Sequence, residues 1–130
     1  MAFKHLSIAA ICAVFLGSPV LAHHSHGNYD VLKWTTLEGT VKELHLVNPH
    51  SFLHLQIKDD KGQVAIWALE GSGAAALRGK GISRETFKPG DPLKVRCHAL
   101  KDGGNGCLLG FVTPLHGDAA RGHGVEVEWR

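Results

Sequence analysis

Apolar and polar residues alternate along much of the chain, a pattern that predicts β-strands. In residues 50–59, HSFLHLQIKD, the side chains of Ser51, Leu53, Leu55 and Ile57 share one face. A two-residue period is typical of a strand with one buried face. The same pattern predicts further strands over 36–48 and 61–70, a hairpin of two strands within 91–115, and a last edge strand in 125–129.

Turn-forming residues separate the predicted strands. Asn48–Pro49 ends the first strand, and KDDKG at 58–62 joins the second strand to the third. The segment 71–81, GSGAAALRGKG, predicts one short helix with Ser72 as its N-cap. KPGD at 88–91 predicts a tight turn that leads into the hairpin.

The order of these elements predicts an all-β fold. Three strands joined by hairpins, a short α-helix between strands three and four, and the remaining strands fit a small OB-like β-barrel of five to six strands. A two-layer sandwich is the alternative architecture, because hairpin-linked strands can also form two packed sheets. The position of the helix favours the barrel.

Residues 1–22 are expected to form a Sec signal peptide rather than part of the domain. The apolar run 6–17 is too short to span a bilayer, and the segment after it ends on the small residue Ala22, as signal peptidase requires. Cleavage there leaves 23–130 as one domain with a histidine-rich start, 23–30, and no predicted membrane span. The expected location is the bacterial periplasm or the surrounding medium.

Charge does not indicate a nucleic-acid partner. The 14 Lys and Arg residues against 12 Asp and Glu leave a net charge of +2, and no basic run is present. Histidine is the unusual residue type, because of 10 histidines all except His5 follow the predicted cleavage site. Imidazoles ligate metals, although histidines scattered over a surface are common.

Cys97 and Cys107 lie in the two arms of the predicted hairpin, where a disulfide is expected. The register that pairs these cysteines also places Val95 opposite Leu109, so that apolar faces pack around the bridge. Export to an oxidising compartment favours the bridge. Two buried thiols in a slipped register are the alternative.

The mature N-terminus is the first candidate metal site. If cleavage exposes His23, its α-amine and imidazole form a chelate, because a terminal amine loses its proton near neutral pH at little cost. His24 or His50 supplies a further nitrogen, and nitrogen ligands in a flattened geometry favour Cu(II). Copper is therefore the expected cofactor. A solvated histidine-rich tail that binds metal adventitiously is the alternative.

Residues on the strands are candidate partners of this site. His50 and His54 are four residues apart on one strand, about 13 Å at roughly 3.3 Å per residue, so at most one of them is expected to join His23. His50 is preferred because it adjoins a turn. His45 on the facing strand could approach His54, although cross-strand histidine pairs on an exposed face are ordinary. Glu70 is either a further ligand or orients an imidazole. A solvated or helix-capping glutamate is the alternative.

Several motifs resemble the domain of unknown function 6152 family, which comprises small exported bacterial proteins. They are AHHSHGNYD, GTVKELHLVNPHSFLHL, WALEG, KPGD and KDGGNGCLLGFVT. The resemblance implies export and a shared fold, and it implies no activity, substrate or cofactor. His26 departs from the family pattern, which has an apolar or aromatic residue there, so it is the N-terminal histidine least expected to share a family role.

Two classes of function follow from these patterns. The first is copper binding, storage or delivery at the N-terminus. The second is a metal-free OB-like module that binds a small ligand or an envelope protein, with Trp34, Phe52 and Trp67 as contacts unless they pack in the core. A triad of Ser51, His50 and Glu70 could be assembled, but no nucleophile elbow or oxyanion loop accompanies it. Enzyme activity is therefore not the expected function.

Overall fold

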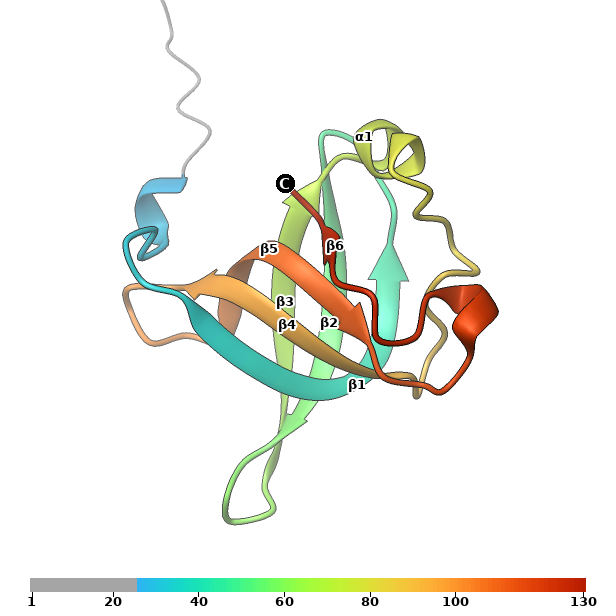
Figure 1. Ribbon diagram of the computed structural model, residues 1–130. Helices are drawn as coiled ribbons and strands as arrows, with labels where there is room; N and C mark the ends of the chain where they lie inside the picture. The colour runs from blue at the N-terminus through green and yellow to red at the C-terminus, as the bar shows by residue number, and fades with distance from the viewer. Residues whose placement is uncertain (1–25) are drawn as a thin grey trace, which may run out of the picture.

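The computed structural model describes residues 26–130, in which β-strands make up most of the regular structure (Figure 1). The strands are β1 (Thr35–His45), β2 (His50–Lys58), β3 (Val64–Ser72), β4 (Pro92–Ala99), β5 (Gly106–Pro114) and β6 (Val127–Glu128). The helix α1 (Ala74–Gly79) lies between β3 and β4, and short 3-10 turns occur at His26–Asn28 and Ala119–Arg121. The predicted signal peptide, with His23 and His24, lies outside the described residues.

Five of the strands close into a barrel. Antiparallel neighbours run in the order β3-β2-β1-β4-β5, and β3 also pairs in parallel with β5, with Leu69 opposite Cys107. This last pairing joins the two ends of the sheet, which a sandwich would leave open. The short strand β6 pairs with β5. The predicted OB-like barrel is confirmed, and the sandwich alternative is wrong.

The side chains of β2 alternate between the core and the outer face of the barrel, as predicted. Leu53 and Leu55 are fully buried, whereas Phe52 and His54 remain partly exposed. Apolar burial of this kind is the main favourable contribution to folding. The buried apolar residues that form the core are Val41, Leu53, Leu55, Leu69, Leu77, Ile82, Phe87, Leu93, Val95, Cys97, Cys107, Leu109, Val112 and Trp129.

The helix α1 begins one residue later than a cap at Ser72 predicts. Ser72 as N-cap is wrong, because pairing between β2 and β3 continues to Ser72, which lies opposite His50. The cap position is occupied by Gly73, which offers no side-chain oxygen. The Asn48 carboxamide oxygen, from the turn before β2, instead accepts a hydrogen bond from the backbone N–H of Ala75 (3.2 Å).

No helix within residues 26–130 is both long enough and apolar enough to cross a membrane.

The predicted disulfide between Cys97 and Cys107 is present, with Cα atoms 5.7 Å apart. The predicted register of the hairpin is wrong. Cys97 lies opposite Leu109 and Val95 opposite Val112, so the bridge runs diagonally between β4 and β5. The shift of two residues is already present beside the hairpin loop, where Ala99 lies opposite Cys107, and a bulge between Arg96 and Cys97 adds one more residue before Val95. The parallel pairing of β5 with β3 is a further constraint that the hairpin pattern does not contain.

Removing this bridge is expected to lower the stability of the barrel. The cysteines are separated by 10 positions in sequence, and for a loop of this length the chain-entropy model gives about 2 to 3 kcal/mol. Urea denaturation of Cys97→Ala/Cys107→Ala, compared with the oxidised protein, measures the loss in free energy of unfolding. Alkylation of the unreduced, unfolded protein should label neither cysteine, and two labelled thiols would contradict the bridge.

The C-terminal segment returns to the barrel and contributes to its core. The Trp129 side chain is fully buried and packs against Phe87, with ring centroids 5.4 Å apart. The backbone N–H of Trp129 donates to the Gly110 carbonyl (2.9 Å), and its carbonyl accepts from the N–H of Ser72 (2.9 Å). The predicted edge strand therefore exists as β6, and the residue that follows it is a core residue.

Candidate functional site

A cavity of about 700 Å³ lies where the first described residues, α1 and the C-terminus meet. Figure 1 shows the C-terminus between the N-terminal 3-10 turn and α1. Trp129 is part of its apolar lining, and its polar lining consists of His26, His50, Glu70, Ser72, His98 and Arg130. A concave, largely apolar site with a few convergent polar groups is the usual form of a ligand or metal site.

Glu70 holds two partners at this cavity. One of its carboxylate oxygens, Oε1, contacts Nδ1 of His50, and Oε2 accepts a hydrogen bond from the Tyr29 hydroxyl (2.7 Å). The register of β2 and β3 places His50 two positions from the residue opposite Glu70, and therefore on the same face. A bridge between Tyr29 and Leu100 ties the N-terminal segment to the end of β4.

The surroundings of Tyr29 keep its hydroxyl protonated. Burial, the hydrogen bond to Glu70 and the charge of that carboxylate together raise the pKa of Tyr29 well above its usual value. Tyr29 therefore remains a donor to Glu70 at any physiological pH. A carboxylate held in this way orients the His50 ring and favours the tautomer with the proton on Nδ1, in which Nε2 is the nitrogen that a metal would bind.

Two further histidines lie at the cavity. His98 is buried, and its Nδ1 lies 2.8 Å from the carbonyl oxygen of Lys33. Its ring is also 4.1 Å from that of Trp34, measured between centroids. His26 is exposed in the 3-10 turn that opens the described chain, and it lines the same cavity. His26, the N-terminal histidine least expected to share a family role, therefore lies at the cavity.

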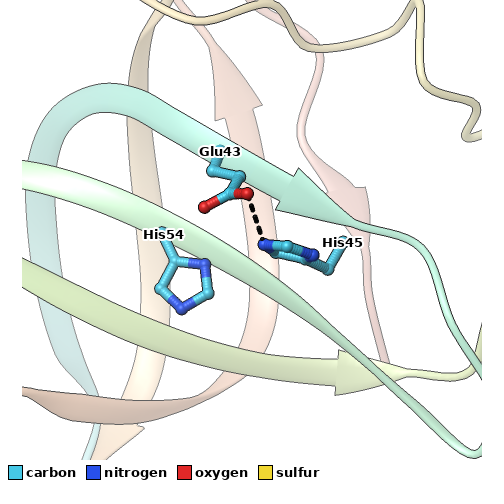
Figure 2. Close-up of side chains that lie close together, drawn as sticks. All are labelled: Glu43, His45 and His54. Carbon is cyan, nitrogen blue, oxygen red and sulfur yellow. Dashed lines mark ion pairs between the residues drawn. The ribbon is translucent and has the colours of Figure 1, made fainter.

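The strand residues predicted as metal ligands divide between two places. His50 and Glu70 meet at the cavity, as described above. His54 lies instead with Glu43 and His45 on the outer side of β1 and β2, away from the barrel core (Figure 2). His45 does lie close to His54, with ring centroids 5.4 Å apart.

The aromatic residues of the alternative ligand site lie in three different environments. Trp34 is half exposed and has Phe111 as a neighbour, with ring centroids 5.7 Å apart. Phe52 stacks with His54 on the outer face of β2, and Trp67 packs against the core. The lining of the 700 Å³ cavity includes none of Trp34, Phe52 and Trp67.

Ser51, the nucleophile of the triad considered above, is held by the backbone. It is fully buried, its hydroxyl donates to the Val47 carbonyl oxygen (3.2 Å), and its Oγ accepts from the Val47 N–H (3.3 Å). These bonds close the turn before β2. His50 and Glu70 lie on the opposite face, at the cavity, because successive side chains of a strand alternate between faces.

Two residues of this site, Tyr29 and His98, were not among the residues predicted from the sequence. Tyr29 could have been predicted as a site residue, because it is an aromatic residue with a polar end within the histidine-rich segment 23–30. His98 could not, because it lies beside Cys97 in an ordinary strand pattern. Its position at the cavity follows from how the N-terminal segment crosses the end of β4.

The fold and the site define a small OB-type barrel with a cavity lined by histidine and glutamate side chains. The chain belongs to the family of unknown function DUF6152, whose model matches residues 11–109. This range contains β1 to β4 and the first part of β5, and it includes His50, Glu70 and both disulfide cysteines. The family resemblance found in the sequence is confirmed. No curated protein and no solved structure matches the chain significantly.

Proposed function

We propose that the protein is exported and binds copper between its mature N-terminus and His50. The α-amine and imidazole of His23 form the chelate, and His50 supplies a further nitrogen. The observation that carries the proposal is the contact between Glu70 and His50 on the wall of a cavity that His26 also lines. Three residues of chain span at most roughly 11 Å, so a metal held at His23 lies within reach of this wall.

In this proposal Glu70 orients His50 and is not itself a ligand. Its two oxygens contact His50 and Tyr29, which suits a carboxylate that holds a metal-ligating imidazole in place. The resulting ligand set consists of nitrogens, which favours Cu(II). His24, the next residue along the chain, is the alternative source of the third nitrogen.

Export is part of the proposal because signal-peptide cleavage creates the α-amine. The apolar run and the small residue Ala22 support cleavage before His23. The disulfide between Cys97 and Cys107 also supports export, because such bridges persist in oxidising compartments. The proposed location is the bacterial periplasm or the medium.

Equilibrium dialysis of the processed protein against copper and a competing chelator tests this function. We expect stoichiometric copper in the native protein and weaker binding in Glu70→Gln, by about 10- to 100-fold, because loss of the residue that orients a metal-ligating histidine typically has this effect. His50→Ala should weaken binding further without abolishing the N-terminal chelate.

His116→Ala is the matched control, because it removes an imidazole from a distant part of the chain. Its copper affinity should equal that of the native protein. A processed protein that retains no copper would contradict the proposal, and equal losses in all three variants would indicate a nonspecific effect of histidine number or of folding.

A second function, a metal-free module that binds a small ligand or an envelope protein, is favoured by the form of the cavity. It is concave and largely apolar, with a few polar side chains in its lining, which is the usual form of a small-ligand site. The contacts of such a ligand are the cavity residues rather than Trp34, Phe52 and Trp67.

A further inference from the structure

A β-bulge in β1 brings three potential metal ligands together on the outside of the barrel. Up to Val41 the odd-numbered residues of β1 face the core, and after the bulge between Val41 and Glu43 the inward residue is Leu44. The bulge inserts one extra residue into β1. Without it, Glu43 and His45 would point inward, because a shift of one residue exchanges the two faces of a strand. With it, Glu43 lies directly opposite His54.

The three side chains converge on one point. Each offers one ligand atom, and these atoms all lie within 4.8 Å of one another. His45 Nε2 is 2.8 Å from Glu43 Oε1, and the rings of His45 and His54 meet nearly at right angles, at 86°. Figure 2 shows a ring nitrogen of His54 turned toward the other two side chains.

One atom of the cluster has no partner. Nδ1 of His54 is buried and makes no hydrogen bond within the part of the chain that the structure describes. Neighbouring side chains therefore shield this nitrogen from water without providing a donor or an acceptor in return, an arrangement that costs free energy. A cation placed between the three side chains would supply the missing partner.

We propose that Glu43, His45 and His54 form a second metal site, which binds a divalent ion of the zinc type. Two imidazoles and one carboxylate are a common protein ligand set for Zn²⁺, with the fourth position taken by water. Glu43 and His45 are exposed, so an ion can enter from solvent. Small side-chain rotations would bring the three ligand atoms to bonding distance.

This site goes beyond the proposed function and does not depend on it. His54 is four residues from His50 along β2, about 13 Å at roughly 3.3 Å per residue, so the two histidines cannot share one ion. The bulge in β1 places Glu43 and His45 beside His54. His54 therefore belongs to a different cluster from His50.

Titration with Zn²⁺, followed by NMR of the histidine side chains, tests the second site. The background is full-length processed protein carrying His23→Ala and His24→Ala, so that the N-terminal chelate does not contribute. We expect the His45 and His54 imidazole resonances to shift together and to saturate at one Zn²⁺ per chain. His54→Ala should weaken this binding by at least about 10- to 100-fold, the typical effect of losing even a residue that only orients a ligand.

Glu43→Gln is the second variant, because it keeps the size of the side chain on an exposed position and so preserves the fold. It should also weaken zinc binding. His116→Ala is the control, because His116 and His123 form another histidine pair, with ring centroids 6.1 Å apart. In both of these residues Nδ1 accepts a backbone hydrogen bond, from Asp118 and Gly117 respectively.

Unmoved His45 and His54 resonances, or an equal loss of zinc binding in His116→Ala, would overturn the second site. These outcomes are distinct from failure of the copper proposal, which is a loss of copper binding by the processed protein with an intact N-terminus. Each site can therefore fail alone.

Discussion

A single residue added ahead of His23 is expected to lower the copper affinity of the processed protein by at least about 100-fold, or about 2.7 kcal/mol. The added residue moves the α-amine out of the chelate ring and leaves every imidazole in place. A copper site that uses the terminal amine therefore loses its chelate ring and much of its affinity. A histidine-rich tail that binds copper only through imidazoles keeps the same affinity. Titration against a competing chelator measures the difference, and intact mass first confirms that the native chain starts at His23.

Two variants complete this test. His23→Ala should lose as much affinity as the extended protein, because it removes the imidazole of the same chelate. His123→Ala, far along the chain, should retain native affinity. An extended protein that binds copper as tightly as the processed one would exclude the N-terminal chelate and leave the metal-free cavity as the better explanation of the site.

Trp129→Ala is expected to lower the free energy of unfolding by about 3 to 5 kcal/mol, the range observed when buried tryptophan or phenylalanine is truncated. The Trp129 side chain is fully buried, and it packs on Phe87. It also lies against Gly71, where even a Cβ atom would come within 3.1 Å of the indole ring. Urea denaturation measures the loss.

Trp129→Phe separates packing from polar effects at the same position. Phenylalanine keeps an aromatic ring and removes the Nε1–H that has no hydrogen-bond partner among the described residues, so it should cost much less than alanine. Val125→Ala, in the same segment but exposed, should change stability by no more than about 0.5 kcal/mol. Equal stability of Trp129→Ala and Val125→Ala would show that the C-terminus does not contribute to the core.

The fold was predictable because most of its determinants are local. The two-residue period of β2, the turn at Asn48–Pro49 and the short alanine-rich helix each follow from residues close together in the chain. The connection of three hairpin-linked strands to a helix then limits the architecture to a few choices. Closure of the barrel settles the choice, because β3 pairs with β5, a strand that no local pattern links to it.

The bulge in β1 has a signature in the sequence from which it could have been predicted. Apolar residues at 37 and 41 are odd-numbered, whereas those at 44 and 46 are even-numbered, which marks a change of face between them. That change is what places Glu43 and His45 beside His54. The register around the disulfide is shifted first by the hairpin loop, because Ala99 rather than Cys97 lies opposite Cys107, and then by one more residue at a second bulge before Cys97.

By itself the sequence determined the strand pattern, the family and the pair of cysteines that bridge, because periodicity, motifs and cysteine positions are properties of the chain that need no partner. Only the tertiary structure decided which polar residues meet. Tyr29, His50, Glu70 and His98 come from four separate segments and converge because the barrel closes and the N-terminal segment crosses its end. Their contacts depend on register and on bulges, where a shift of a single residue moves a side chain to the opposite face.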